Sequence, residues 1–285
     1  MKLVKYQLPN GDVAVGELDD DRVLPLDLSG GHFQSLFDIL ETDNPLEVAD
    51  FLVDRKRAVP LSGVKLLAPI DHQEVWAAGV TYRRSQAARM EESDSAASCY
   101  DAVYSSPRPE LFFKATPHRV VGPGQPVRIR ADSKWTVPEP EIALVLSSHL
   151  TLSGFTIGND MTSRDLEGQN PLYLPQAKIY DGCCALGPCV TLAGKMPPHD
   201  TIRIRMIVRR EGSAIFEGRT SAAQMARPFG DLIGWLSRDN SFPKGAFLLT
   251  GTGIVPDNDF ALQPGDMIGI SVDGIGTLIN SVVQG

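Results

Sequence analysis

The sequence predicts an α+β protein that is mostly β, in which a small α+β domain precedes a larger β-rich domain. Short apolar stretches recur along the 285 residues, and 26 glycines and 21 prolines separate many of them. Long stretches with helical spacing of apolar residues are few. We therefore expect a closed or rolled β-sheet in the larger domain.

The small domain is expected to span residues 1–66. Asn10-Gly11-Asp12 is a hairpin signal between two alternating stretches, VKYQL and VAVGEL. Residues 33–53 then carry apolar residues at helical spacing, with an interruption near Asn44-Pro45. The proline-bounded stretch 60–69 leads into the next domain.

The larger domain is expected to span residues 67–285. The clearest strand predictions there are 74–79, 141–147, 202–209 and 267–273. In the third of these, IRIRMIVR, the alternation predicts isoleucine and methionine on one face and arginine on the other.

Residues 83–110 interrupt the β pattern. The part from 83 to 106 is polar, rich in alanine and serine, and prone to form helix. An insertion of this kind between two strands is often a lid over a site, and we expect one here. A solvated surface helix is the alternative.

Composition argues against several classes of protein. A net charge of −8 disfavours a nucleic-acid partner. The chain has no apolar run of about 18 residues or more, as a membrane helix would need, and its start lacks an apolar signal core. The 4 cysteines form no C-x-x-C pair, so neither a zinc site nor a disulfide framework is expected. A cytoplasmic protein is the expectation.

Three acidic residues form the main candidate metal site. Glu139 and Glu141 stand two apart before an apolar strand, so extended backbone would direct both carboxylates to one face. Taken alone, a pair of exposed loop glutamates is the commoner explanation. Asp160, in the GNDMTSRD stretch, supplies a third acid. Three close carboxylates repel unless a cation neutralises them, and oxygen ligands suit hard cations such as Mg²⁺ or Mn²⁺.

Four further features accompany these acids. A helical turn would bring Arg164 and Glu167 to the same side. Lys178 would bind a carboxylate or an enolate oxygen, although a lone lysine is more often an ordinary surface residue. The TGTG turn offers an anion its backbone N–H groups and the hydroxyls of Thr250 and Thr252. It lacks the P-loop lysine and the dinucleotide glycine spacing, so no nucleotide cofactor is expected.

Together and in this order, these segments resemble the fumarylacetoacetate hydrolase (FAH) superfamily over roughly residues 70–285. The matching segments are EPE at 139–141, GNDMTSRD at 158–165, Lys178 ahead of the GP at 187–188, and TGTG at 250–253. The resemblance implies a β-roll or pseudo-barrel fold. It also implies a Mg²⁺ or Mn²⁺ ion held by Glu139, Glu141 and Asp160, with Arg164 and Lys178 as catalytic residues.

Within this superfamily, the stretches at 90–116 and 167–178 are most similar to the 2-keto-3-deoxy-D-arabinonate dehydratases. Hydrolytic relatives carry a histidine in a segment resembling N-Y-x-x-H, and Ser85 stands at that position here. The resemblance thus implies a Mg²⁺-dependent dehydratase of a 2-keto-3-deoxy sugar acid, such as the D-arabinonate or D-xylonate. Its product would be 2-oxoglutarate semialdehyde.

The implied reaction assigns roles to further residues. Glu167 is the first choice for the general base and Lys178 the second. Glu91 or Glu92 on the lid would protonate the departing hydroxyl. The residues expected to bind the substrate are Arg84, Arg89, Thr250 and Thr252.

Two alternatives stay open at this point. One is a metal-dependent hydrolase of a 2,4-dioxo acid, either an acylpyruvate or a diketo-deoxy sugar acid. The other is a protein that binds a keto acid without converting it. The resemblance also implies a homodimer or a homotetramer.

Overall fold

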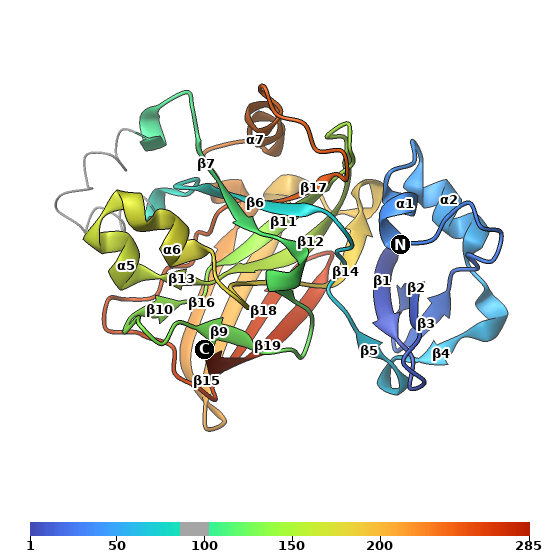
Figure 1. Ribbon diagram of the computed structural model, residues 1–285, viewed down its shortest axis with the longest axis horizontal. Coiled ribbons are helices and arrows are strands. Elements are labelled where there is room, and N and C mark those ends of the chain that lie inside the picture. The colour runs from blue at the N-terminus through green and yellow to red at the C-terminus, as the bar shows by residue number, and fades with distance from the viewer. Residues whose placement is uncertain (86–102) are drawn as a thin grey trace.

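The computed structural model describes residues 1–85 and 103–285, whose strands form two large sheets and one short two-stranded sheet (Figure 1). Most of the predicted lid, including Arg89, Glu91 and Glu92, lies outside the described residues. The lid therefore stays a prediction.

The N-terminal residues form the predicted hairpin and helices. Strands β1 (Lys2–Gln7) and β2 (Val13–Asp19) pair antiparallel, and Gly11 takes the positive φ of +93° that the turn requires. The interruption near Asn44 separates two helices, α1 (Leu36–Leu40) and α2 (Pro45–Leu52). The Asn44 side chain accepts a hydrogen bond from a backbone N–H of the first turn of α2, so it acts as the N-cap.

The larger sheet runs in the order β4, β3, β2, β1, β14, β12, β11, β17, β6, β7, with β5 beside β1 and β8 beside β14. Besides β1 and β2, its strands are β3 (Arg22–Pro25), β4 (Val59–Pro60), β5 (Lys65–Leu66), β6 (Glu74–Gly79), β7 (Glu110–Ala115), β8 (Val120–Val121), β11 (Pro140–Leu146), β12 (Leu152–Asp160), β14 (Cys184–Leu192) and β17 (Ala246–Leu249). Because β1 pairs with β14, the N-terminal strands continue the sheet of the larger predicted domain. The boundary at residue 66 stays a prediction.

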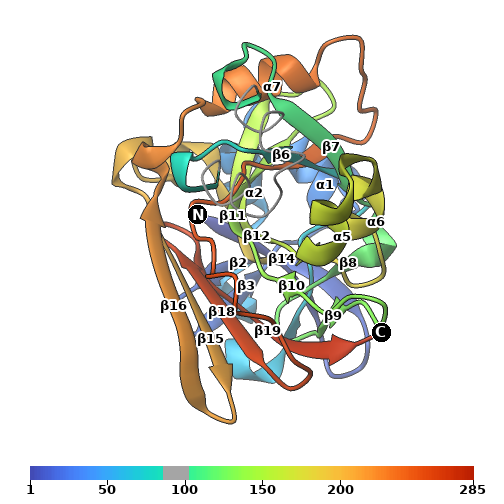
Figure 2. The same ribbon diagram turned by 90° about the vertical axis from the view of Figure 1, so that its left-hand side faces the viewer.

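The second sheet has the order β16, β15, β18, β19, β9 and forms a layer along one side of the molecule (Figure 2). Its strands are β9 (Val127–Ile129), β15 (Arg203–Arg210), β16 (Ser213–Ser221), β18 (Met267–Val272) and β19 (Gly276–Gln284). Along β15, Ile204 and Met206 are buried while Arg203 and Arg205 are exposed, which confirms the predicted alternation. Neither sheet closes on itself within the described residues, so a rolled arrangement is observed rather than a closed barrel.

Strand β11 is buried on both faces because two apolar clusters meet across the larger sheet. Ile142 and Leu144 point into the core shared with the second sheet. Ala143 and Val145 point into a core that includes residues of α1 and α2. A strand covered on both faces has a nearly continuous apolar sequence, as IALVL does.

The remaining elements cover the ends of the sheets. They are β10 (Thr136–Val137), β13 (Thr162–Ser163), α5 (Arg164–Gln169), α6 (Leu174–Lys178) and α7 (Phe229–Leu236), with short 3₁₀ turns η1 (Arg55–Arg57), η2 (Leu61–Gly63), η3 (Pro117–Arg119), η4 (Pro171–Tyr173), η5 (Ala193–Lys195), η6 (His199–Thr201) and η7 (Ala222–Gln224). Helices α5 and α6 lie beside the short β10–β13 pair (Figure 1). In the part of the chain that the structure describes, no helix has the length and apolar character needed to cross a membrane.

Candidate active site and metal centre

Antiparallel pairing of β11 with β12 brings the three predicted acids together. Glu139 immediately precedes β11, Glu141 lies within it, and Asp160 ends β12. In the register of the two strands Pro140 faces Asn159, so both ends with acids lie at the same edge. One oxygen from each carboxylate lies within 4.8 Å of the others, and all three side chains are buried. The spacing along the sequence and the fold therefore place three oxygen donors around one point.

The electrostatics of this acidic cluster call for a cation. Burial, and then the nearby Asp160 and Glu139 carboxylates, raise the pKa of Glu141 well above its ordinary value. The Lys178 ammonium, and then a hydrogen bond of 2.5 Å from the Gly251 N–H to Glu141 Oε2, oppose this rise only in part. Three converging oxygen donors in a buried setting fit a hard divalent cation such as Mg²⁺. Glu139, Glu141 and Asp160 are the residues that would hold it.

Two predicted cations lie against these acids. Lys178, the last residue of α6, donates from Nζ to Glu139 Oε2 at 2.8 Å, Asp160 Oδ2 at 2.9 Å and Thr162 Oγ1 at 2.7 Å. Arg164 starts α5 and donates from Nη2 to Glu139 Oε1 at 2.7 Å. Both side chains are buried, whereas a lone basic residue usually lies on the surface.

A third cation, Lys114, was not singled out from the sequence. It is fully buried in β7, and its Nζ lies 2.5 Å from Asp160 Oδ1. Burial by itself would lower the pKa of Lys114, but the Asp160 carboxylate raises it above the ordinary value. The available signal was one charged residue inside the apolar stretch LFFKA. A buried lysine needs an anionic partner, which only the fold identifies.

A small cavity adjoins the acids and Lys178. Glu167 is buried in its wall on α5, and Glu110, at the start of β7, provides a second carboxyl group there. Ser85, which the resemblance sets at the histidine position of hydrolytic relatives, also lines the cavity. Glu110 is a further residue that the sequence did not indicate, because it is one acid in an ordinary proline-rich turn. The full lining is Ala78, Gly79, Val80, Ser85, Glu110, Phe112, Glu139, Glu141, Asp160, Glu167, Lys178, Gly251 and Thr252.

The TGTG turn contributes mainly through its backbone. Gly251 has a φ of +90°, and a Cβ atom there would overlap the Thr81 hydroxyl. This conformation directs the Gly251 N–H to Glu141. The Thr250 hydroxyl donates to the Ile142 carbonyl at 2.9 Å, whereas Thr252 lines the cavity. Substrate binding by the two threonines stays a prediction.

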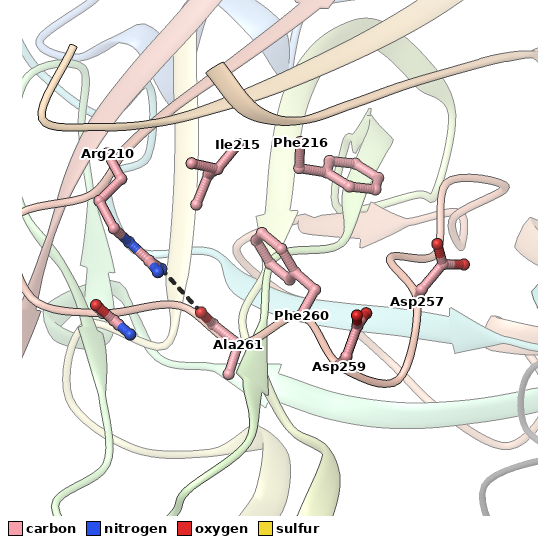
Figure 3. Close-up of a pocket in the computed structure, with 8 residues that line it drawn as sticks. Arg210, Ile215, Phe216, Asp257, Asp259, Phe260 and Ala261 are labelled. Atoms are coloured by element: carbon pink, nitrogen blue, oxygen red, sulfur yellow. Dashed lines mark hydrogen bonds between the residues drawn. The ribbon is translucent and has the colours of Figure 1, made fainter. Parts of the chain in front are cut away.

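Arg84 is exposed and is not among the residues that line the cavity. Its guanidinium is 3.7 Å from the exposed Asp257 carboxylate. Asp257 belongs to a different pocket (Figure 3). In this pocket Phe216 and Phe260 lie between Arg210 at one end and Asp257 and Asp259 at the other. Arg210 closes one side of this pocket by donating to the Ala261 carbonyl at 3.0 Å. The role of Arg84 in substrate binding stays a prediction, and Arg89 lies outside the described residues.

The fold and this site define a class of protein with known members. The family profile described as fumarylacetoacetate (FAA) hydrolase C-terminal matches residues 74–283, and the chain belongs to this family. The match includes the three acids and the three buried cations.

Two curated relatives are similar over most of the chain. A probable 2-keto-3-deoxyxylonate dehydratase from Haloferax volcanii is 45% identical over 241 residues, covering 85% of this chain and 80% of the relative. A 2-dehydro-3-deoxy-D-arabinonate dehydratase from Saccharolobus solfataricus is 42% identical over 229 residues, covering 79% of this chain and 77% of the relative.

A solved structure extends the likeness to the whole fold. It is that of 2-keto-3-deoxy-D-arabinonate dehydratase complexed with magnesium and 2,5-dioxopentanoate. Its TM-score with this structure is 0.88 at 36% sequence identity, and the match covers 100% of this chain and 99% of that one.

Proposed function

We propose that this protein is a Mg²⁺-dependent dehydratase of a 2-keto-3-deoxy pentonate, with 2,5-dioxopentanoate (2-oxoglutarate semialdehyde) as the product. The observation that carries the proposal is the convergence of Glu139, Glu141 and Asp160 on one buried point beside Lys178. The dehydratases at 45% and 42% identity, and the related complex with magnesium and 2,5-dioxopentanoate, support the choice of reaction and cofactor.

The charge balance of the described site supports a divalent cation and a monoanionic substrate. Four buried carboxylates face three buried cations, which leaves one net negative charge when all four are ionised and Glu110 is the neutral acid proposed below. A divalent cation and a 2-keto acid carboxylate would together bring the sum to zero, as a buried site requires. The charged groups are Glu139, Glu141, Asp160, Glu167, Lys114, Arg164 and Lys178.

In the proposed reaction, a bound Mg²⁺ would polarise the 2-keto group and acidify the proton on carbon 3. Glu167 accepts that proton, and the Lys178 ammonium stabilises the charge that develops on the keto oxygen. The bond between carbon 4 and its hydroxyl breaks, a double bond forms between carbons 3 and 4, and water leaves. Glu110, the other carboxyl group in the cavity wall, is placed to protonate the departing hydroxyl. Tautomerisation involving carbon 5 then gives the dioxo acid, with one water lost overall.

The composition of the cavity wall favours elimination over hydrolysis. The histidine that the resemblance gives hydrolytic relatives as their water-activating base is replaced here by Ser85, whose hydroxyl is too weak a base, while Glu167 is proposed to act on the carbon-3 proton. Ser85 lines the cavity. A small 2-keto acid is therefore the proposed substrate class, and the loss of water is the proposed chemistry.

A panel of 2-keto-3-deoxy pentonates and acylpyruvates, analysed by mass spectrometry with Mg²⁺ and with EDTA, tests this proposal. We expect a product 18 mass units lighter than a keto-deoxy pentonate (about one water), formed with Mg²⁺ and not with EDTA, because the metal activates the keto group. Asp160→Asn is the matched inactive control. Cleavage of an acylpyruvate into two acids, with no dehydration, would instead establish the hydrolase.

We further propose that the protein is a homodimer or homotetramer in the cytoplasm. Size-exclusion chromatography with light scattering would measure the oligomeric state, and a monomer at micromolar concentration would contradict it.

A further inference from the structure

The two buried lysines of the site differ in what surrounds them. Lys178 lines the cavity, and its contacts with Glu139, Asp160 and Thr162 are all to side-chain oxygens, two of them on proposed metal ligands. Lys114 does not line the cavity and has no exposed surface. The Lys114 ammonium therefore neutralises charge from behind the site, whereas the Lys178 ammonium faces the space where substrate would bind.

Lys114 contacts two segments that are far apart in the sequence. Its Nζ lies 2.5 Å from Asp160 Oδ1 and donates to the Met161 carbonyl at 2.9 Å, at the end of β12. It also donates to the Lys178 carbonyl at 2.5 Å, at the end of α6. Two of these contacts are hydrogen bonds to carbonyl oxygens and the third is an ion pair with Asp160, so Lys114 links β7 to both segments.

We infer that Lys114 is a positioning residue that fixes the Asp160 carboxylate and the Lys178 main chain, and thereby sets the affinity of the site for a divalent cation. This inference rests on the proposed function. Partners that hold a metal-ligating side chain in place typically contribute about 10-fold to 100-fold to metal affinity. Lys114 holds one oxygen of Asp160 and leaves the other facing Glu139 and Lys178.

Lys178 is expected to have the opposite effect on metal binding. Its ammonium lies between Glu139 and Asp160, on the oxygens that a cation would share. A positive charge so close repels a second cation in a low-dielectric site. Removal of the Lys178 charge should therefore leave Mg²⁺ affinity unchanged or raised, while removal of the Lys114 charge should lower it.

The first test measures Mg²⁺ binding to the substrate-free protein by isothermal titration calorimetry, for wild type, Lys114→Met and Lys178→Met. We expect Lys114→Met to raise the Kd at least about 10-fold, and Lys178→Met to leave it equal or lower. A Kd for Lys114→Met within twofold of wild type would overturn the inference, as would equal weakening by both variants. Absence of Mg²⁺ binding in wild type would refute the proposed function instead.

The second test separates positioning from a general loss of structure. At saturating Mg²⁺, kcat of Lys114→Met should recover toward wild type, whereas that of Lys178→Met should stay low. In an Asp160→Asn background, Lys114→Met should change the residual Kd by less than it does in wild type, because its ion pair with the Asp160 carboxylate is already lost. An undiminished effect in that background would contradict the assignment.

A third variant covers the case in which the first one misfolds. If far-ultraviolet circular dichroism finds Lys114→Met unfolded, Lys114→Gln replaces it, since glutamine keeps an N–H donor and loses the charge. The same increase in Kd of at least about 10-fold is expected. A folded Lys114→Gln with wild-type Mg²⁺ affinity would overturn the inference.

Discussion

Replacement of Glu141 by glutamine should make the metal-free protein more stable and remove its response to Mg²⁺. Burial and the neighbouring carboxylates raise the pKa of Glu141, so the native protein holds this proton to a higher pH than the unfolded chain does. Below the pKa of the unfolded chain, this proton contributes its full stabilisation to the metal-free protein. That stabilisation is lost as pH rises through the raised native pKa. The loss is about 1.4 kcal/mol for each pH unit that separates the two pKa values. The Glu141→Gln variant loses this dependence and keeps an amide oxygen for the Gly251 N–H.

The expected response of wild type to Mg²⁺ follows from mass action. At a Mg²⁺ concentration about 100 times its Kd, binding stabilises the native state by about 2.7 kcal/mol. For 285 residues the entropy of unfolding is about 600 cal/mol/K, so this corresponds to a rise in Tm of about 4–5 °C. If the loss of one carboxylate ligand weakens binding about 100-fold, the same concentration contributes about 0.4 kcal/mol and less than about 1 °C.

Differential scanning calorimetry at pH 8, in EDTA and over a Mg²⁺ series, measures both effects. Glu211→Gln is the matched control, because Glu211 is exposed and distant in sequence from the three acids. This variant should behave as wild type in both conditions. A lower Tm of Glu141→Gln than of wild type in EDTA would contradict this prediction. A rise in Tm with Mg²⁺ as large as that of wild type would contradict it equally.

Three further substitutions test separate parts of the structure. Glu167→Gln should lower kcat by about 10²-fold to 10⁴-fold without changing the Kd for Mg²⁺, because it removes a proposed base and no proposed ligand; unchanged turnover would exclude Glu167 as the base. Gly251→Ala should cost about 1–3 kcal/mol of stability and weaken Mg²⁺ binding, since its φ is +90° and a Cβ atom would overlap the Thr81 hydroxyl; calorimetry would show no change if that strain were absent. Leu144→Ala should lower the free energy of unfolding by about 2–5 kcal/mol, because Leu144 is fully buried in the core between the sheets; a loss below about 1 kcal/mol in urea denaturation would contradict that packing.

Local patterns predicted the elements well where one face or one turn decides the structure. The alternation in β15 predicted its buried and exposed residues, and Asn10-Gly11-Asp12 predicted the first hairpin. Both signals depend only on neighbours within a few residues. The pairing of β1 with β14 could not be predicted in this way, because the paired residues Lys2 and Thr191 are separated by more than half of the sequence.

The residues of the site show the same difference between local and tertiary signals. Glu139 and Glu141 are two apart on an extended segment, so their convergence follows from backbone geometry alone. The contact of Lys114 with Asp160 and with the Lys178 carbonyl depends on how β7, β12 and α6 pack, and no local pattern reports it. Glu110 enters the cavity for the same reason. Sequence reasoning thus located the three acids, Arg164, Glu167 and Lys178, and missed Lys114 and Glu110, which the tertiary fold brings to them.

Anomalous diffraction from crystals soaked with Mn²⁺ would show whether Glu139, Glu141 and Asp160 hold a divalent cation. We expect one strong anomalous peak about 2.0–2.2 Å from an oxygen of each carboxylate, as hard octahedral cations require, and its loss in Asp160→Asn crystals. A keto acid added to the same crystals should place its carboxylate and keto oxygens on that ion. A Mn²⁺ peak elsewhere, with none of these three carboxylates on the ion, would contradict this assignment.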